Sequence, residues 1–294
     1  MHLHTFTAGV TGTPSFRRFR IHDVNPVSGV IKWRVISDPN APMRVIHGRL
    51  KSWLRGMNLK MPHATGALPK CSPRANVLRH AGNRYFYLTD IHNAYPSIRR
   101  ESLAMMLRYL LPDDTEEAIN EFLDRYCFSP KGGLVIGAVA SPDLFNLFCA
   151  VSIDKELGEI AARGNMVYTR YLDDLTFSSR VPISRRVRRE IRAAIARESF
   201  SVSHRKSQVL DLVKGPIVIN GVGLHKDGST FLPRKYMRHL RGLIHRAMTR
   251  DDVKPAEIHG KMGVFFSTSE PKRRNWVERR LLNLHGEWRM FQSL

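Results

Sequence analysis

Two adjacent aspartates, Asp173 and Asp174, lie within the stretch YTRYLDDLTFSS, which is otherwise rich in aromatic, β-branched and hydroxyl residues. Such residues favour β-structure, so the stretch predicts a strand, a tight turn and a second strand, with the aspartates at the tip. Neighbouring like charges repel one another and lose hydration on burial, which a bound cation would offset. The simpler alternative is a solvated polar turn, because aspartate favours turns for local hydrogen-bonding reasons.

Asp90 ends an earlier apolar strand, YFYLTD, which runs into a turn that stops at Pro96. If this strand and the predicted hairpin are neighbours in one sheet, three carboxylates meet at one place. Hard oxygen ligands are those that magnesium prefers, and two ions about 3.5–4 Å apart can hold both oxygens of a phosphoryl displacement. The sequence therefore predicts a two-magnesium site, and the alternative for Asp90 is a strand-end cap.

The charge balance indicates a polyanionic partner. Lys and Arg number 47 against 26 Asp and Glu, a formal net charge of +21 over 294 residues. An excess of this size favours nucleic acid ahead of an anionic membrane. No apolar run approaches the roughly 20 residues that span a bilayer, and the N-terminal stretch lacks the apolar core of a secretion signal. Three widely spaced cysteines fit a reducing compartment, so we expect a cytoplasmic protein without a membrane partner.

The order of the expected elements predicts an α+β body with an appended helical subdomain. Residues 17–50 read as an irregular basic β-region followed by a short helix. A helix over 113–128 is expected to begin with Asp114 and Glu117 as a capping box. Another helix is expected from Ser141, as its N-cap, to Gly164, and a basic amphipathic helix lies within 181–200.

The segment after Gly228 is expected to be helical and basic. It carries 14 Lys or Arg against 6 Asp or Glu. Spacings of three and four residues place a cationic stripe on one helical face, formed by Arg234, Lys235, Arg238, Arg241 and His245. The opposite face is apolar, formed by Met237, Leu240, Leu243, Ile244 and Ala247. Such a helix suits the backbone of a nucleic-acid duplex, with a membrane surface or a solvated face as alternatives.

Five segments, in this order along the chain, resemble motifs of the reverse transcriptase family, and of bacterial retron enzymes and phage-defence relatives in particular. They are NVLRH (76–80), LTDIHNAYPSI (88–98), GGLVIGAVASPDLFNLF (132–148), YLDD (171–174) and VSHRKSQVL (202–210). The resemblance covers the chain from about Arg17 to His245, and its strength lies in the joint order and spacing of the segments. It implies a right-hand polymerase, in which an antiparallel palm sheet is flanked by helices.

The resemblance also implies domains and a metal site. The N-terminal segment and fingers would cover 1–85, the palm with inserted fingers helices 86–225, and a basic helical thumb 226–294. The catalytic residues would be Asp90, Asp173 and Asp174, which would ligate two Mg²⁺ ions together with Ile91, with Mn²⁺ as a substitute.

Further contacts are carried over residue by residue. Tyr95 would exclude a ribose 2′-OH and so select deoxynucleotides, its alternative being a core tyrosine. Arg34 would grip the incoming triphosphate and Lys206 the leaving pyrophosphate, unless they are solvated surface charges. Gly137 would adjoin the nucleotide. Lys70, with the thumb residues Arg234, Lys235, Arg238 and Arg241, would contact nucleic acid.

Three positions depart from the family pattern. Ile136 replaces a glutamine that normally lies beside nucleotide and template, which puts nucleotide affinity and substrate preference in question. Lys70, Cys71 and Ser72 stand where retron enzymes usually have GRS. INGVGL from Ile219 replaces the usual VTG, in a hairpin that would hold the primer end unless it is an ordinary buried hairpin. His80 is expected to orient a neighbouring loop.

The expected activity is RNA-directed DNA synthesis on a structured noncoding RNA, in a retron-like or anti-phage system. The partners would be that RNA as template and primer, the DNA product, dNTPs, and an effector protein or second polymerase encoded nearby. Two alternatives stay open: template-independent or protein-primed DNA synthesis, and an RNA-binding scaffold with a vestigial polymerase.

Overall fold

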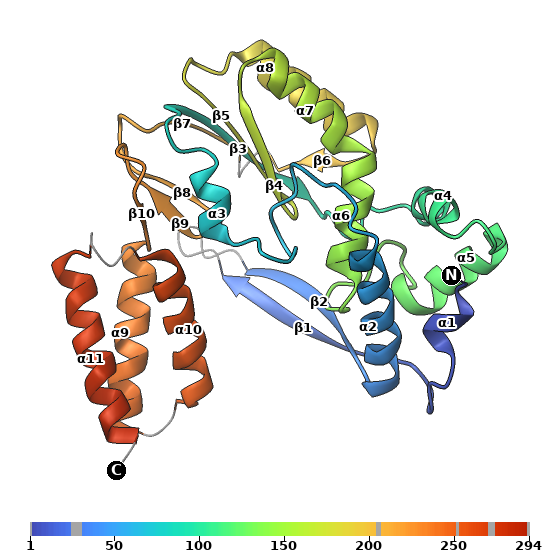
Figure 1. Cartoon of the computed structure of the whole chain (residues 1–294), viewed down its shortest axis with the longest axis horizontal. Helices are drawn as coiled ribbons and strands as arrows, with labels where there is room; N and C mark the ends of the chain where they lie inside the picture. Colours follow the sequence, from blue (N-terminus) through green and yellow to red (C-terminus); the bar gives the residue numbers. More distant parts are fainter. Residues whose placement is uncertain (1, 25–30, 204–206, 251–252, 270–273, 293–294) are drawn as a thin grey trace.

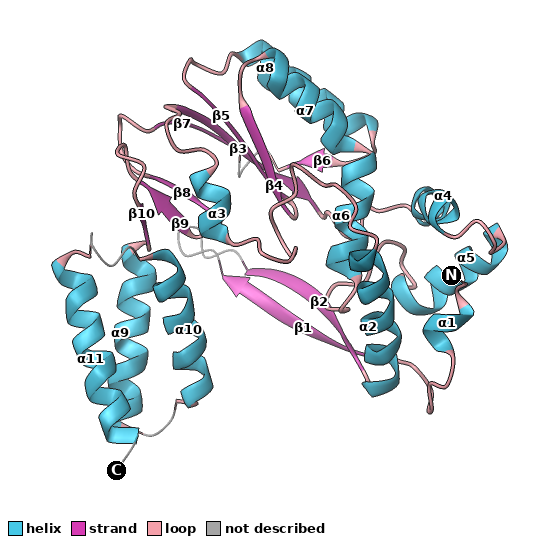
Figure 2. Cartoon of the chain, in the orientation of Figure 1, coloured by secondary structure: helices cyan, strands magenta, loops and turns pink. Residues whose placement is uncertain are grey.

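The computed structural model describes residues 2–24, 31–203, 207–250, 253–269 and 274–292. Strands and helices are mixed along the chain until a final run of helices, which confirms the α+β prediction (Figure 2). Figure 1 shows a central sheet with helices beside it, a long hairpin below it, and a three-helix bundle at the C-terminal end. Within the described residues, no helix is both long and apolar enough to cross a membrane.

The central sheet is antiparallel and contains the strands that the sequence analysis singled out. Its order is β4-β5-β3-β6, and β7 also pairs with β3. The strands are β3 (Tyr85–His92), β4 (Val167–Tyr171), β5 (Asp174–Ser179), β6 (Ser201–Val202) and β7 (Gln208–Asp211). The predicted strand-turn-strand is therefore confirmed as the β4–β5 hairpin, and the predicted neighbour of this hairpin is β3.

Helices cover the sheet and build the main core. They include α6 (Ser141–Val151), α7 (Ile153–Arg163) and α8 (Arg185–Arg197), with α4 (Arg100–Leu110), α5 (Glu116–Phe122) and the π-helix η1 (Leu123–Cys127) beside them. Their buried apolar side chains form one cluster with those of the sheet, in which Phe145 and Phe177 are fully buried. Burial of this contiguous apolar area is the main force that holds the sheet and helices together.

The N-terminal region is more regular than expected. β1 (Phe16–Val24) and β2 (Ile31–Pro39) form an antiparallel hairpin, and α2 (Ala41–Gly56) follows after the N-cap Asn40. The predicted order of a β-region and a helix is confirmed, but the strands pair regularly and the helix is longer than expected. Along β2 the apolar residues Ile31, Trp33 and Val35 alternate with polar ones, which is typical of a strand, and all three are exposed rather than packed in the core. A short helix, α1 (His4–Thr7), precedes the hairpin.

Two helix boundaries also differ from expectation. The helix predicted over 141–164 is divided at Ser152, whose ψ of −78° departs from helical geometry. The Ser152 hydroxyl donates to the Phe148 carbonyl, which already accepts the helical bond from the Ser152 N–H, and such back-bonding bends helices. Its N-cap is Ala140, and Ser141 already lies within the helix. The cap of α5 is Thr115, whose hydroxyl accepts from Ala118 N–H, while the Asp114 carboxylate accepts from Leu3 N–H instead.

A second small sheet and a helical bundle complete the chain. The order is β10-β9-β8, with β8 (Ile217–Ile219), β9 (Val222–Leu224) and β10 (Thr230–Phe231), and α3 (Pro73–Leu78) packs against it. The bundle comprises α9 (Arg234–Thr249), α10 (Pro255–Thr268) and α11 (Trp276–Gln292) around its own apolar core. The predicted apolar face of α9 is confirmed, because all five of its residues are buried.

Candidate active site

The β4–β5 turn that carries the aspartates is conformationally strained. Tyr171 pairs with Asp174, so Leu172 and Asp173 form a two-residue loop. Leu172 has a φ of 55°, while Asp173 keeps a negative φ, which matches a type II′ hairpin turn. Glycine usually takes this position, and a leucine there costs on the order of 1 kcal/mol or more. The surrounding structure must therefore hold the turn in place.

Three neighbours hold the turn from below. Gly66 lies so close that an added Cβ would come within 2.9 Å of the Leu172 amide nitrogen. Arg170 donates from Nη1 to the Leu172 carbonyl at 3.3 Å and to Asn146 Oδ1 at 2.8 Å. Asn146 in turn donates to the Gly66 carbonyl at 2.9 Å. The backbone of the turn is thus tied to α6 and to the loop before α3.

A buried ion pair fixes Arg170 itself. Its guanidinium is fully buried and donates from Nη2 to Asp154 Oδ2 at 2.7 Å, with two further contacts through Nε. The Tyr168 hydroxyl donates to Asp154 Oδ1 at 2.8 Å, and burial raises the pKa of this tyrosine well above its usual value. Such a pair withstands desolvation only when its hydrogen bonds are satisfied, as they are here. This network sets the position of the β4–β5 turn.

The three predicted carboxylates belong to residues that lie near the end of β3 and at the β4–β5 turn. Asp90 lies directly opposite Asp174 in the register, and Ile91 N–H donates to the Asp173 carbonyl at 2.9 Å. Directly opposed residues have Cβ atoms about 4.5–5.5 Å apart, and like charges there are destabilising. Asp90 is only 6% exposed, so water screens this repulsion poorly. A carboxylate pair in this setting has the oxygen donors and the charge that a divalent cation requires.

The described side chains near the β4–β5 turn do not by themselves form a complete metal-binding cluster. Across the part of the chain that the structure describes, no three Asp, Glu, His or Cys side chains are gathered closely enough to hold a metal ion. The register unites Asp90 and Asp174 on one face of the sheet, and Asp173 adjoins them in the turn.

A hydrogen-bond relay reaches Asp174 from two distant segments. Asn220 donates from Nδ2 to Asp174 Oδ2 at 2.8 Å, and Asn76 donates from Nδ2 to Asn220 Oδ1 at 2.6 Å. An ionised carboxylate only accepts, which fixes the direction of both amides. Asn220 and Gly221 form the β8–β9 turn with positive φ values of 48° and 81°, typical of a type I′ hairpin. We call Asn76, Asn220 and Asp174 the asparagine relay.

His80 connects the two strands of the β4–β5 hairpin. Its ring nitrogens lie 2.7 Å from Thr169 Oγ1 on β4 and 2.7 Å from Ser178 Oγ on β5. Burial lowers the pKa of His80 to about 3, so the ring is neutral and one nitrogen donates while the other accepts. The expected orienting role is thus directed at the sheet, rather than at a loop. Sequence analysis missed this bridge and the relay, although Asn76 and His80 both lie in the NVLRH segment.

Tyr95 lies beside the carboxylates and is held by α6. Its ring stacks on Phe145 at 5.0 Å between centroids, with 13° between the planes. Burial, and secondly the charge of Asp173, raise the pKa of the Tyr95 hydroxyl. The stacking fixes the ring in one orientation next to Asp173. The partial burial of the ring fits a core tyrosine, and its position close to Asp173 fits a role in nucleotide selection.

Comparison with known proteins identifies the family of this chain. Residues 24–236 match the family model described as "Reverse transcriptase (RNA-dependent DNA polymerase)". The chain belongs to the reverse transcriptase family. Its curated relatives support the predicted retron type: it is 27% identical to the retron Mx65 reverse transcriptase of Myxococcus xanthus over 241 residues, covering 77% of this chain and 56% of the relative.

Two further retron reverse transcriptases give similar results. The Mx162 enzyme of Myxococcus xanthus is 30% identical over 202 residues, which is 58% of this chain and 41% of that enzyme. The Ec86 enzyme of Escherichia coli is 26% identical over 162 residues, which is 55% of this chain and 49% of the relative. The matched regions thus span about half the length of these relatives.

Solved structures support the predicted right-hand fold. A telomerase from Candida albicans, solved with a fragment of telomeric RNA, has a TM-score of 0.54 at 9% identity and covers 95% of this chain and 57% of its own. An apo telomerase from Candida tropicalis has a TM-score of 0.52 at 10% identity, with coverages of 86% and 56%. At this identity the likeness shows the fold alone, and we refer below to the central sheet with its helices as the palm and to the terminal bundle as the thumb.

The nucleotide-binding predictions fall in two places around the palm. Gly137 lies beside β2, where an added Cβ would come within 2.9 Å of the Ser37 carbonyl oxygen, and its φ is +105°. Ile136 accepts from Ser37 N–H at 2.7 Å through its backbone, and its side chain is half-buried. Arg34 is exposed on β2 of the same hairpin. Lys206 lies outside the described residues.

The nucleic-acid-binding predictions lie on the surface. Lys70 is exposed in the loop before α3, with a φ of 60°. On α9 of the thumb, Arg234, Lys235 and Arg238 are exposed, and Arg241 is half-buried. The bundle lies on the lower left of Figure 1, next to the β8–β10 sheet.

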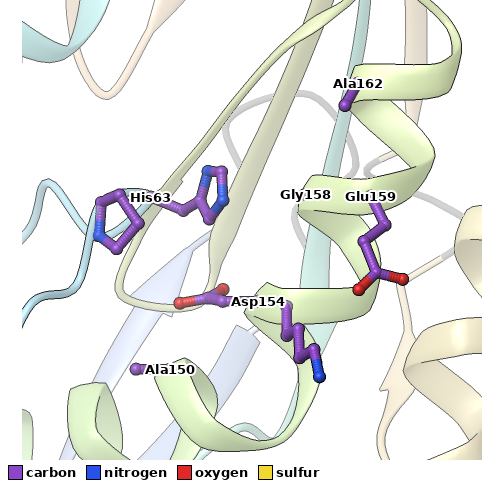
Figure 3. A pocket seen from close by; sticks show the side chains of 8 residues that line it. His63, Ala150, Asp154, Gly158, Glu159 and Ala162 are labelled. Atoms are coloured by element: carbon purple, nitrogen blue, oxygen red, sulfur yellow. The ribbon is translucent and has the colours of Figure 1, made fainter.

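A pocket of about 470 Å³ beside α7 is a poor candidate for the active site. It is lined by Asp154, Lys155, Glu159 and His63 among others. Figure 3 shows the Asp154 carboxylate and the His63 ring on one side of α7, with the Glu159 carboxylate pointing away from them. Because Asp154 is held by Arg170 and Tyr168, it cannot serve there as a free acid or base.

Proposed function

We propose that this reverse transcriptase is an RNA-directed DNA polymerase that extends a primer by attack of its 3′-OH on the α-phosphate of a dNTP. The observation that carries the proposal is the register of β3 and β5, which opposes Asp90 to Asp174 next to Asp173. Opposed carboxylates, of which Asp90 is nearly buried and Asp174 half-buried, repel each other, and a bound cation offsets that repulsion. This arrangement also argues against a vestigial scaffold.

In this proposal, Asp90, Asp173 and Asp174 hold two Mg²⁺ ions, with Mn²⁺ as a substitute and Ile91 adjoining the set. When bound, the ions would supply Lewis-acid stabilisation of the attacking and leaving oxygens. Asn220 would orient the Asp174 carboxylate through its amide, because a side chain hydrogen-bonded to a metal ligand fixes the position of that ligand. The Arg170 network would keep the strained turn in the conformation that presents Asp173.

The remaining site residues would position the nucleotide and the duplex. The Tyr95 ring, fixed by Phe145, would exclude a 2′-OH, while Gly137, Arg34 and Lys206 would contact the nucleotide. Lys70 and four thumb residues would contact nucleic acid, namely Arg234, Lys235, Arg238 and Arg241. We further propose fingers within 1–85, palm within 86–225 and thumb within 226–294, and a cytoplasmic location.

The template would be a structured noncoding RNA, because the curated relatives are retron reverse transcriptases. That RNA would supply template and primer, and the DNA product would stay with the enzyme. A role in anti-phage defence, with an effector protein or a second polymerase encoded nearby, belongs to the same proposal.

One observation favours a second candidate, which is template-independent or protein-primed DNA synthesis. Ile136 has an aliphatic side chain in place of glutamine, and its backbone is engaged with Ser37, so it offers no side-chain hydrogen bond to a template base. Loss of that contact would weaken the dependence of incorporation on a template.

Primer extension by the purified protein with labelled dNTPs and Mg²⁺ separates these candidates. An RNA template with an annealed DNA primer would be compared with the same template digested by RNase beforehand, and with the variant Asp173→Asn/Asp174→Asn. We expect product only with intact RNA, and a loss of about 10⁴-fold in the variant, since two metal ligands are weakened. Product that survives RNase, or that becomes covalently attached to protein, would support the second candidate. If no product forms while the protein still binds RNA tightly, the result would support an RNA-binding scaffold with a vestigial polymerase.

A further inference from the structure

Helix α8 carries a dense cationic surface that the polymerase reaction does not use. We define the α8 arginine face as Arg185, Arg186, Arg188, Arg189 and Arg192. Four of them recur at helical spacing and line one shallow depression. The opposite side of the helix, with Ile191, Ala194 and Ile195, is buried in the palm core.

The arginines of this face are not neutralised by neighbouring acids. The carboxylate closest in sequence, Glu190, pairs with Arg163 on α7, and Glu156 of α7 pairs with Arg197 beyond the cluster. In the described parts of the chain, no arginine of the face forms an ion pair with a carboxylate. Arg185, Arg186 and Arg189 are exposed, and Arg188 and Arg192 are half-buried, so the face presents an unneutralised positive charge at the surface.

The location of the cluster on its helix is unfavourable for stability. It begins at the first residue after the N-cap Ser184, and the first turn contains no acidic residue. The N-terminal end of a helix carries about half a positive charge, so cations there lower the stability of the helix. Helix α8 thus keeps a concentration of charge that folding does not favour.

The face is remote from the polymerase cleft. Strand β5 leads away from Asp174 over its six residues, a strand length of about 17 Å at 3.3 Å per residue, and residues 180–184 then lead to α8. In Figure 1, α8 lies at the top of the molecule and the thumb at the bottom left. A duplex held between palm and thumb would therefore leave this face open.

We propose that the α8 arginine face binds the phosphate backbone of a double-stranded nucleic acid outside the polymerase cleft. From Arg185 to Arg192 the helix rises about 10 Å, a length over which a duplex presents about six phosphates. The helix has no aromatic residue between Arg185 and Arg197, whereas surfaces for single strands rely on aromatic stacking. Duplex backbone is thus the polyanion that best fits these residues, and the site goes beyond the proposed polymerase activity.

Binding to hairpins without nucleotide tests the proposal independently of DNA synthesis. An RNA hairpin, a DNA hairpin of the same sequence and a single strand would be titrated against the full chain over a range of salt. The test variant is Arg185→Gln/Arg188→Gln/Arg189→Gln/Arg192→Gln. Its matched control is Lys60→Gln/Lys131→Gln/Lys214→Gln/Lys226→Gln, which removes the same charge from four scattered exposed positions. Glutamine has nearly the helix propensity of arginine, so Tm should not fall in the test variant.

We expect the test variant to bind at least one hairpin about tenfold or more weakly than the control does. The slope of log affinity against log salt should decrease by about 3 to 4 in magnitude, as four lost phosphate contacts require. Extension of a short primer–template that fills only the cleft should be unchanged. Which hairpin is affected identifies the nucleic acid as RNA or DNA. Binding of both hairpins equal to that of the control, or an equal loss with the single strand, would overturn the proposal.

Discussion

The palm and the thumb of this protein hold their functional residues in opposite ways. Around the palm carboxylates, buried polar groups from four distant segments are hydrogen-bonded to one another, as in the asparagine relay and the Arg170–Asp154 pair. The thumb is a three-helix bundle with an apolar core, and its cations Arg234 and Arg238 are exposed. The difference suits the two tasks, since metal chemistry needs fixed atoms whereas a duplex backbone needs only charge.

Breaking the buried ion pair should have the largest effect. Arg170→Met would leave Asp154 buried without its cation, so the free energy of unfolding should fall by about 3–5 kcal/mol. Urea denaturation would measure this loss. Arg163→Met, which breaks the exposed pair with Glu190, is the matched control and should cost no more than about 1 kcal/mol. Similar values for both variants would show that the palm network does not support the turn.

The relay should affect catalysis rather than binding. Asn220→Gly removes the amide that donates to Asp174 but keeps the positive φ of the turn. We expect kcat to fall about 10- to 100-fold, as it does when a group hydrogen-bonded to a metal ligand is removed. Single-turnover extension would measure kcat, and the Kd of the primer–template should stay constant. Asn165→Gly is the control, because Asn165 has the same φ of 48° and is exposed. An unchanged kcat in Asn220→Gly would remove the relay from the mechanism.

His80 should make the palm sensitive to acid. Its pKa is lowered to about 3 in the folded state, so the unfolded chain binds the extra proton first as pH falls below about 6.5. The stability from the neutral ring is therefore complete above that value, and between pH 6 and 5 the free energy of unfolding should fall by about 1 kcal/mol. Denaturation curves of wild type and His80→Gln would test this. An equally steep pH dependence in the variant would assign the effect to other groups.

Thumb substitutions should have the smallest effect on activity and the clearest dependence on salt. In Arg234→Gln/Arg238→Gln, we expect nearly normal extension at low salt, and a salt slope of duplex binding reduced by about 2. Fluorescence anisotropy over a salt series would measure the slope, with Lys131→Gln/Lys214→Gln as the charge-matched control. If the thumb variant lowered kcat while Asn220→Gly altered the salt slope, the contrast between the two regions would be reversed.

Local patterns predicted the parts of this molecule that depend on nearby residues. The β4–β5 hairpin, the strand with Asp90 and the apolar face of α9 all follow from residue type, alternation or helical spacing. The relay and the His80 bridge join residues 46 to 144 positions apart, and no periodicity encodes such pairings. The predicted helix boundaries differ from the observed ones for a related reason. The hydroxyl of Ser152 bonds a helix carbonyl and that of Thr115 caps a helix, and tertiary packing decides which of several nearby polar residues takes such a role.

We propose that the palm carboxylates support templated DNA synthesis. Single-nucleotide incorporation opposite each of the four RNA template bases, with one dNTP supplied at a time, tests it most directly. We predict that only the complementary dNTP is added, and that Asp173→Asn/Asp174→Asn adds none. Equal addition of all four dNTPs whatever the template base would show that synthesis is not templated. Synthesis that persists in the variant would show that Asp173 and Asp174 are not needed for it.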